Sequence, residues 1–377
     1  MLKKLLKILF KSSFSFKNLG KKEVILFDCD NTKYIKKFFK KENTFTLSVR
    51  LNRIKVIYLN KKVVLFILKN LFNNKLKTNY LLSLIEQIKP KLLITHIDNS
   101  QDFYLVAKSI HKKISCLAIQ QAHRADLNTN PYKEIKNIFI PNLFCFSDYD
   151  KILFRNNKVN VSKFYSTGSL NLAYAFNYLK KNKIKKQQIY DICLVSEPHL
   201  NVQDEFNNIK NFADTCGLIS IYTHRLCIEE NLKLIFVGES VKNTLSGKRE
   251  IQFYDKYLGK NKFNISQQAK STFPSYQRIY QSKLTIGHVS TMLREAIGLK
   301  KKVLYCNFSG SEMIKSPLSG IAEIKKPSYK EFKKKVLKIL SLSDKKYFDS
   351  LRIEYDKIML PPSETFKNIS DKIKKFQ

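Results

Sequence analysis

Polar and titratable side chains gather at several places in this sequence, each directly after an apolar run. The first group, His96, Asp98, Asn99 and Ser100, follows Lys-Leu-Leu-Ile-Thr. A carboxylate beside an imidazole can deprotonate a hydroxyl group, so His96 and Asp98 are candidate catalytic residues and Asn99 a candidate contact to an acceptor. A turn followed by a helix capped at Asn99 or Ser100 explains the same residues, and both interpretations stay open.

Two further groups lie nearby in the chain. Gln120, His123 and Arg124 offer hydrogen-bond donors and one titratable ring after the run Ser-Cys-Leu-Ala-Ile. Gly168 and Ser169 follow another apolar stretch, as at the entry to a phosphate or sugar pocket. A solvated loop and a plain turn are the competing interpretations.

A third kind of site is indicated in the second half of the chain. After the apolar run 284–286, the sequence leaves through Gly287 and His288, and Ser290 or Thr291 can cap the helix that follows. Exposed N–H groups and the positive end of a helix suit an anion such as a diphosphate. Glu295, about one turn further, could accept hydrogen bonds from ribose hydroxyls. An ordinary capped helix after a strand has the same pattern.

Two other residues of the second half are candidates for the donor site. Arg225 follows a predicted strand at 218–222 and could pair with phosphate oxygens in a bidentate way. Gly238 follows a predicted strand at 233–237. For both, a place on the protein surface without a role is the alternative.

Several common motifs are absent from the sequence. It has no G-x-x-x-x-G-K-[ST], G-x-G-x-x-G, G-x-S-x-G or H-E-x-x-H pattern. The run Asp28-Cys29-Asp30 has metal-binding spacing, but we interpret it as a turn and predict no metal site. The seven cysteines are scattered without a C-x-x-C pair, which favours free buried thiols in a reducing compartment.

The elements that must position these residues alternate between strands and helices. We predict strands at 24–27, 54–59, 91–96, 115–120 and 142–147, then 190–195, 218–222, 233–237, 284–286 and 302–305. Helices are predicted at 62–73, 79–88 and 101–112, then 203–215, 250–258, 275–281, 290–298 and 329–341. Apolar strands alternating with helices indicate parallel sheets covered on both faces. Two such α/β halves predict a cleft at the carboxyl ends of their strands.

The polar stretch after residue 180 separates the two halves. We expect a basic N-terminal segment at 1–22, an acceptor-side Rossmann-like domain at 23–182, a nucleotide-sugar domain at 190–345 and a helical tail at 346–377. Residues 1–11 have apolar and lysine faces that suit either a membrane surface or packing on the domain itself. No run reaches the ~18 apolar residues that a membrane span needs.

The formal net charge of +38 is the strongest feature of the composition. Such a field attracts phospholipid, nucleic acid or phosphate-bearing substrates. Only 9 of the 69 basic residues are arginine, which is also what an AT-rich genome produces. Both explanations stay open.

Three segments carry a resemblance to a known family. They are 92–104 together with 118–124, then 146–170, and then 280–296. In these the chain resembles the bacterial surface-carbohydrate biosynthesis proteins, which are GT-B-type glycosyltransferases similar to capsule-synthesis and CDP-glycerol-type polymer transferases. The resemblance implies two Rossmann-like domains, a nucleotide-sugar donor in the second, an acceptor glycan in the first, and no tightly bound metal or cofactor. Ala122 stands where the family pattern has glycine, which weakens the match of the acceptor loop.

The sequence therefore favours a cytoplasmic glycosyltransferase at the inner face of the membrane, extending a lipid-linked or surface polysaccharide. Asp98 would be the base, assisted by His96 or His123, and the helix start at Ser290 would hold the donor phosphates. A polyol-phosphate transferase or a sugar-nucleotide epimerase on the same fold is the nearest alternative. A basic nucleic-acid-binding protein or a membrane adaptor is an alternative of another class, although no nucleic-acid-binding module is recognisable.

Overall fold

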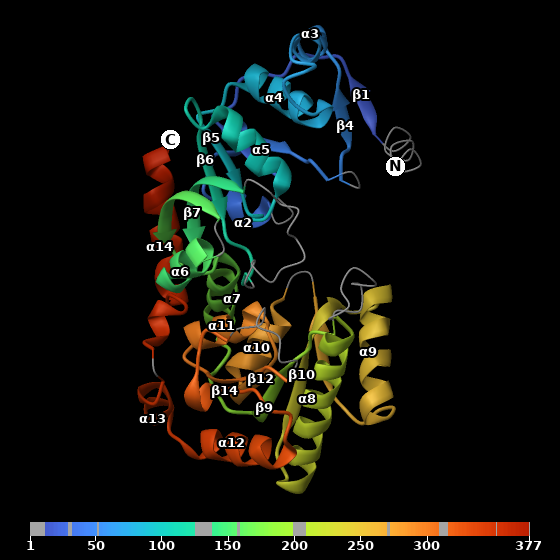
Figure 1. Cartoon of the computed structure of the whole chain (residues 1–377), viewed down its shortest axis with the longest axis vertical. Coiled ribbons are helices and arrows are strands. Elements are labelled where there is room, and N and C mark those ends of the chain that lie inside the picture. Colours follow the sequence, from blue (N-terminus) through green and yellow to red (C-terminus); the bar gives the residue numbers. More distant parts are fainter. Residues whose placement is uncertain are drawn as a thin grey trace.

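The computed structural model describes residues 12–28, 32–50, 53–124, 138–156, 159–198, 209–269, 272–308, 316–351 and 353–376. Within these ranges the chain forms two α/β domains, one above the other in Figure 1. The predicted α/β class with two Rossmann-like domains is confirmed. The predicted amphipathic segment 1–11, Cys29 and Asp30 of the predicted turn, and the first residues of the predicted helix 203–215 lie outside the described residues.

The first domain is built on a six-stranded parallel sheet in the order β3-β2-β5-β6-β7-β8. Side chains of β2 alternate between its two faces: Ile25 and Phe27 join one core cluster, and Val24 and Leu26 join another. This burial on both sides explains the continuous apolar runs of the sequence. The strands are β2 (Val24–Phe27), β3 (Thr44–Leu47), β5 (Leu92–Thr95), β6 (Ser115–Ile119), β7 (Phe139–Cys145) and β8 (Asn160–Ser166).

The helices of the first domain follow its strands. Asn60 and Ser100 cap α3 and α5 through their side chains, as their residue types favour. The helices are α2 (Thr32–Lys36), α3 (Lys61–Lys69), α4 (Leu76–Ile88), α5 (Gln101–Ile110), α6 (Asp148–Asn156) and α7 (Leu170–Lys181), with a short 3-10 helix at Lys41–Asn43.

The second domain repeats this plan with a parallel sheet in the order β11-β10-β9-β12-β13-β14. Its strands are β9 (Tyr190–Val195), β10 (Leu234–Val241), β11 (Ile265–Gln268), β12 (Ser282–Gly287), β13 (Lys302–Cys306) and β14 (Glu323–Ile324). Its helices are α8 (Ile209–Glu229), α9 (Leu245–Leu258), α10 (Pro274–Tyr280), α11 (Thr291–Gly298), α12 (Tyr329–Ser341) and α13 (Asp344–Asp349), with 3-10 helices at Gly320–Ala322 and Tyr355–Lys357.

The end of the chain returns to the first domain. In α14 (Pro362–Ile373), Ile369 and Ile373 join the core cluster of Val24 and Leu26, and a 3-10 helix follows at Lys374–Phe376. Figure 1 shows α14 in red beside the first domain, although it follows the second in sequence. The segment 346–377 thus connects the two domains instead of standing apart as a tail.

One predicted strand is wrong. Residues 218–222, Leu-Ile-Ser-Ile-Tyr, lie inside the long helix α8. Short apolar runs rich in β-branched residues occur in buried helices as well as in strands, and periodicity alone does not separate the two. Ser220 and Thr223 direct their hydroxyl groups to the carbonyl groups of Cys216 and Ile219, four residues earlier, as such side chains do within helices.

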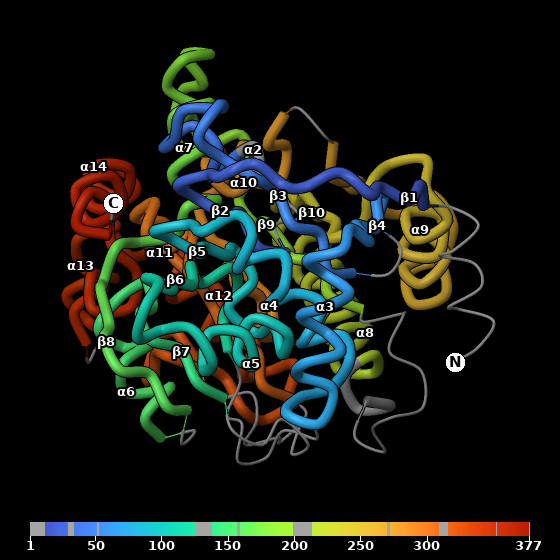
Figure 2. Tube along the Cα trace, turned by 90° about the horizontal axis from the view of Figure 1, so that it is seen from above, coloured from blue at the N-terminus to red at the C-terminus, as the bar shows by residue number. Residues whose placement is uncertain are grey.

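The predicted strand at 54–59 forms a separate structure. Within it, β4 (Val56–Tyr58) pairs in parallel with β1 (Ser13–Ser15), outside the main sheet. Figure 2 views the molecule from the side of α3 and β1.

Two other general features bear on the sequence predictions. Six of the seven cysteines lie in described positions, and all six are buried and free. No helix in the described ranges is both long and apolar enough to cross a bilayer.

Candidate functional site

The predicted strand-to-helix junction is present at the start of α11. Strand β12 ends at Gly287, where an added Cβ atom would lie 3.3 Å from the Cβ atom of Val195 on the neighbouring strand. Ser290 then caps the helix, its hydroxyl accepting a hydrogen bond from the Met292 N–H at 3.2 Å. The Leu293 N–H also bonds to Ser290, through its carbonyl group at 3.1 Å. The positive end of the helix lies at the carboxyl edge of the second sheet, where parallel sheets bind ligands.

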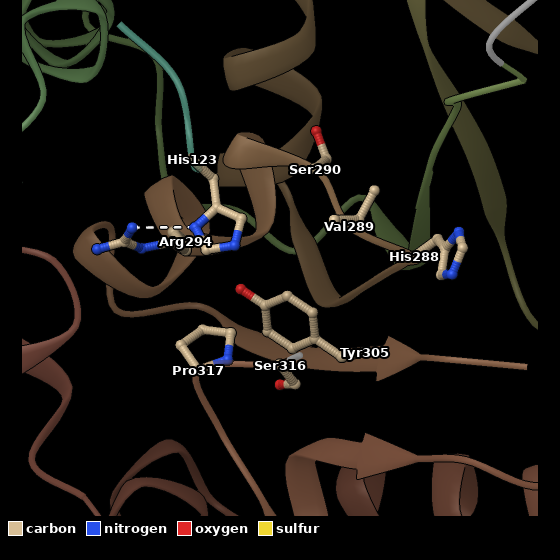
Figure 3. A pocket seen from close by; sticks show the side chains of 8 residues that line it. All are labelled: His123, His288, Val289, Ser290, Arg294, Tyr305, Ser316 and Pro317. Atoms are coloured by element: carbon tan, nitrogen blue, oxygen red, sulfur yellow. Dashed lines mark hydrogen bonds between the residues drawn. The ribbon is translucent and has the colours of Figure 1, made fainter. Parts of the chain in front are cut away.

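A small pocket opens at this helix start (Figure 3). Tyr305, from β13, is 3% exposed, and its hydroxyl has no hydrogen-bond partner among the described residues. In Figure 3 this hydroxyl points to the side where His123 and Arg294 lie. A buried hydroxyl without a hydrogen-bond partner costs free energy, so a polar ligand atom that bonds to it would be stabilised there. The lining residues are His123, His288, Val289, Ser290, Arg294, Tyr305, Ser316 and Pro317.

His123 reaches this pocket from the first domain. Its backbone N–H donates to the Thr291 hydroxyl at 2.8 Å, and Arg294 Nη1 lies 3.1 Å from its Nδ1 atom. Because a guanidinium can only donate, Nδ1 must accept and the ring proton must sit on Nε2. Burial, aided by the positive charge of Arg294, lowers the pKa of His123 to about 3. His123 is therefore a neutral hydrogen-bond donor at physiological pH, and its acceptor nitrogen is already occupied by Arg294.

Arg294 joins the two domains through a buried ion pair. Its two terminal nitrogens each lie 2.8 Å from a carboxylate oxygen of Asp150, and one of them also donates to the Ile358 carbonyl at 2.6 Å. Both side chains are fully buried. Burial alone would raise the pKa of Asp150, but Arg294 holds it below its ordinary value. Sequence reasoning missed both residues, because neither stands in a recognisable motif.

Gln120 supports the same ion pair. Its Nε2 atom donates to Asp150 Oδ1 at 2.9 Å, and its Oε1 atom accepts from the Phe146 N–H at 3.2 Å. The side chain is buried, so in this state Gln120 holds protein groups in place and is closed to an acceptor.

Glu295 makes a second bridge between elements of the two halves. Its carboxylate accepts from the Ser169 hydroxyl at 2.6 Å and from the Tyr276 hydroxyl at 2.8 Å. Ser169 also caps α7. Burial raises the pKa of Glu295 to about 7, so the acid is partly protonated near neutral pH. In this state both oxygens predicted to hold a ribose are occupied by protein hydroxyls.

The residues predicted to act at the end of β5 lie close to one another in the structure. Asp98 accepts from the Gln121 N–H at 2.9 Å and pairs with Arg124, whose Nε lies 2.6 Å from Oδ2. His96 is 1% exposed, and neither ring nitrogen has a hydrogen-bond partner within the described part of the chain. Burial lowers the pKa of His96 to about 4, with Asp98 opposing that shift. Asn99 is exposed in the adjoining turn.

Glu197 is a site residue to which the sequence analysis gave no role. It lies two residues after the end of β9, accepts a long hydrogen bond of 3.4 Å from the Val289 N–H and bonds to the Ser290 hydroxyl. Burial, together with the nearby carboxylate of Glu239, raises the pKa of Glu197 to about 8. Its position just after a strand was the only available signal. A neutral acid at neutral pH thus lies beside the start of α11.

Three predicted site residues lie elsewhere. Arg225 does not follow a strand: it is on α8, exposed, and paired with Glu229 at 2.7 Å. Gly238 lies within β10, where an added Cβ atom would come 2.7 Å from Glu250 Oε2. Gly168 has a φ of +88°, and an added Cβ atom would overlap the Thr365 hydroxyl of α14. The two glycines admit close packing, and the structure does not bring Arg225 to the cleft.

His288 is buried at the edge of the pocket, and its ring is turned away from Arg294 in Figure 3. Among the described residues, no three His, Cys, Asp or Glu side chains are grouped so that they could hold a metal ion. The described site contains hydrogen-bond donors, the neutral imidazoles of His96 and His123, and carboxylates that are paired or hydrogen-bonded.

Comparison with solved structures identifies the fold. No protein-family model and no curated protein sequence matches the chain. The S. aureus MnaA–UDP co-structure superposes with a TM-score of 0.53 at 13% identity, covering 93% of this chain and 94% of that one. UDP-GlcNAc 2-epimerase from Neisseria meningitidis, bound to UDP-GlcNAc, gives 0.52 at 14%, covering 94% and 99%. The Methanocaldococcus jannaschii enzyme, in complex with UDP-GlcNAc and UDP, gives 0.51 at 13%, covering 94% and 100%. At such low identity the likeness is one of fold, the GT-B arrangement of two Rossmann-like domains.

Proposed function

We propose that the chain is a glycosyltransferase that binds a nucleotide-activated sugar at the start of α11 and transfers the sugar to a surface polysaccharide or lipid-linked glycan. The observation that carries this proposal is the convergence of donors on one small pocket. Ser290 and the positive end of α11 come from one domain, and the His123 Nε2–H comes from the other. Tyr305 adds a buried hydroxyl without a partner among the described residues.

The donors of this pocket suit the diphosphate of a nucleotide sugar. Negative charge grows on the diphosphate as the sugar leaves, and fixed N–H groups and hydroxyls lower the barrier by stabilising that charge. The positive end of α11 acts in the same direction. Glu197 bonds to the Ser290 hydroxyl, and its raised pKa keeps it neutral at pH 7, so it does not repel the phosphates. Because His123 lies in the pocket in this state, the nucleotide sugar enters when the two domains part.

Uridine is the base we favour for the donor. The fold neighbours named above were solved with UDP or UDP-GlcNAc, and their nucleotides are the first ligands to test. We assign Glu295 to the support of this site, because its two hydroxyl partners fix α11 against α7 and α10. A direct contact of Glu295 with ribose would require Ser169 or Tyr276 to give up its bond.

The acceptor base in this proposal is His96, with Asp98 beside it. Both ring nitrogens of His96 are without a hydrogen-bond partner among the described residues, so the neutral imidazole has a nitrogen that can accept a proton. Burial lowers its pKa in this state, and the nearby carboxylate of Asp98 opposes that shift and would stabilise the imidazolium that forms. Asp98 itself is held in the ion pair with Arg124, so its carboxylate oxygens are already occupied. His96 is buried here, so an acceptor reaches it once the segment 121–124 moves off the end of β5.

A sugar-nucleotide epimerase is the second candidate, because two of the fold neighbours named above are UDP-GlcNAc 2-epimerases. Epimerisation at a sugar carbon requires a base and an acid on the sugar ring but no acceptor. In the first domain, Asp98 and Asp150 are both held in ion pairs with arginine, which favours transfer with a histidine base.

Product analysis separates the two candidates. The purified chain is incubated with UDP-GlcNAc or UDP-glucose, with and without a synthetic polyprenyl-diphosphate-linked GlcNAc acceptor. A transferase releases UDP only when the acceptor is present, and the acceptor gains the mass of one sugar. An epimerase yields an isomeric UDP-sugar of unchanged mass without acceptor, visible by NMR. If no UDP-sugar binds or reacts, the proposal fails.

The base is tested in the same assay. His96→Gln should lower turnover by about 100-fold or more and leave UDP affinity unchanged. His224→Gln is the matched control, because His224 lies on α8 and bonds to the Lys262 carbonyl. Turnover equal to that of the wild type in His96→Gln would remove His96 from the mechanism.

A further inference from the structure

Large apolar side chains are exposed on one side of α3. Leu65 and Leu68 are 54% and 62% exposed, and Phe72, in the turn after the helix, is 97% exposed. Their spacing of three and four residues aligns them in one stripe. The opposite side of the helix, with Val63 and Phe66, packs on the core of the first domain. A helix on a surface that faces water normally carries polar residues on its outer side. The helix α3 differs, because its outer side is apolar as well as the side that packs on the core.

The strand β1 lies beside α3. Asn60, the cap of α3, donates from Nδ2 to the Lys17 carbonyl at 3.0 Å, and the Leu59 N–H donates to the Ser15 carbonyl at 2.8 Å. The end of β1 therefore lies against the start of α3. Phe14 and Phe16, on either side of Ser15, are both exposed. We call the whole area the α3 surface, formed by Phe14, Phe16, Val64, Leu65, Leu68, Leu71, Phe72 and Leu76.

The α3 surface occupies one end of the molecule. Figure 1 places α3 at the top, on the side of the first domain away from the second, with β1 and β4 beside it. Figure 2, seen from that end, shows α3, α4 and β1 nearest to the viewer. An object as large as a bilayer can therefore meet this end without contacting the second domain.

Exposed lysines border the α3 surface, although two basic residues of the same stretch, Arg50 and Lys77, pair with Asp28 and Asp102. The sequence from Asn43 to Ile85 contains eight basic residues and no acidic one. Lys61, Lys62, Lys69 and Lys75 are exposed along or next to α3. An apolar stripe bordered by lysines is the arrangement by which proteins bind the surface of anionic bilayers. The basic residues are Arg50, Arg53, Lys55, Lys61, Lys62, Lys69, Lys75 and Lys77.

We propose that the α3 surface docks on an anionic phospholipid bilayer, with Leu65, Leu68 and Phe72 entering the headgroup region. A second copy of the chain fits less well, because a symmetric dimer would place the same basic patch against itself. The proposal does not depend on residues 1–11 or on the reaction in the cleft. It sets the orientation of the protein, with the first domain on the membrane and the second away from it.

Vesicle co-sedimentation of the full chain tests this. Vesicles of phosphatidylcholine alone are compared with vesicles of phosphatidylcholine mixed with phosphatidylglycerol. The wild type should bind the mixed vesicles and not the neutral ones. The variant Leu65→Ser/Leu68→Ser/Phe72→Ser should lose binding by about tenfold or more, since each change removes an inserted apolar side chain. Ile228→Ser/Leu245→Ser is the matched control, because both side chains are about equally exposed in the second domain, and it should bind like the wild type.

Two more variants test whether the lysines beside α3 or the N-terminal segment are responsible for vesicle binding. Lys61→Glu/Lys62→Glu/Lys69→Glu should also lose binding to mixed vesicles, whereas Leu5→Ser/Leu6→Ser/Leu9→Ser should keep most of it. Retained binding in the α3 triple variant, or loss only in the N-terminal variant, would overturn the proposal. So would a wild-type dimer in light scattering that the α3 triple variant converts to a monomer while neither binds vesicles.

Discussion

The carboxyl edges of the two sheets hold their acidic residues in opposite ways. At the edge of the first domain, Asp98 and Asp150 are each paired with an arginine. At the edge of the second, Glu197 and Glu250 accept hydrogen bonds from neutral groups, among them the Val289 N–H and the Ser196 hydroxyl. At the first edge, arginines fix both carboxylates and Arg294 holds the pKa of Asp150 below its ordinary value. The second edge contains Glu197, whose charge changes near pH 8.

This difference separates two tasks. Ion pairs buried between elements fix geometry, and the Asp150–Arg294 pair fixes α11 relative to the first domain. At the second edge, Glu197 is neutral at pH 7, and the Tyr305 hydroxyl has no partner among the described residues, so an anion can be accommodated there. The predictions that follow test each edge in turn, beginning with the larger expected effect.

The first prediction concerns the buried ion pair. Arg294→Met leaves the Asp150 carboxylate buried without its partner, which typically costs about 3–5 kcal/mol of unfolding free energy. Urea unfolding followed by circular dichroism measures this cost. Arg225→Met is the control, because it breaks an exposed ion pair with Glu229, and it should change stability little. Equal stability of the two variants would contradict the structural role of Arg294.

The second prediction concerns Glu197 and pH. Its pKa of about 8 means that the acid is neutral below that pH and negative above it. UDP affinity should therefore be highest below pH 8 and should fall as the pH rises through that value, because the carboxylate then repels the phosphates. Calorimetric titration from pH 6.5 to 9.5 measures the change. Glu197→Gln stays neutral and should remove most of the decline; an identical decline in this variant would assign the effect to another group.

Much of the fold was predictable because burial imposes simple patterns. The strands β2 and β5 are short apolar runs, β9 is apolar except for Asp191, and the polar residues that follow these strands are at the carboxyl edges. The start of α11 was predictable from Ser290 and the glycine before it. The run 218–222 was misassigned because it is rich in apolar and β-branched residues, which here belong to the long helix α8, with Ile219 buried and Ile221 exposed. The edge strand β8 was missed because its sequence, Asn-Val-Ser-Lys-Phe-Tyr-Ser, is largely polar and only partly buried.

The site was less predictable than the fold. Sequence position places His96, His123 and Ser290 at strand ends, but pairings between residues far apart are set by tertiary packing. Arg294 and Asp150 are 144 residues apart, and no local pattern relates them. The hydroxyl partners of Glu295 and the neutral state of His123 follow from the same packing, so their roles could be proposed only with the structure.

The central claim is that a nucleotide diphosphate binds at the start of α11, and calorimetric titration of UDP at pH 7 into a matched pair of variants tests it. Asp and Asn both cap helices as well as Ser, so Ser290→Asp and Ser290→Asn should both fold. The account predicts that Ser290→Asn keeps UDP affinity within a few-fold of the wild type, and that Ser290→Asp loses about tenfold or more, because its charge meets the phosphates. Wild-type affinity in Ser290→Asp would contradict the claim.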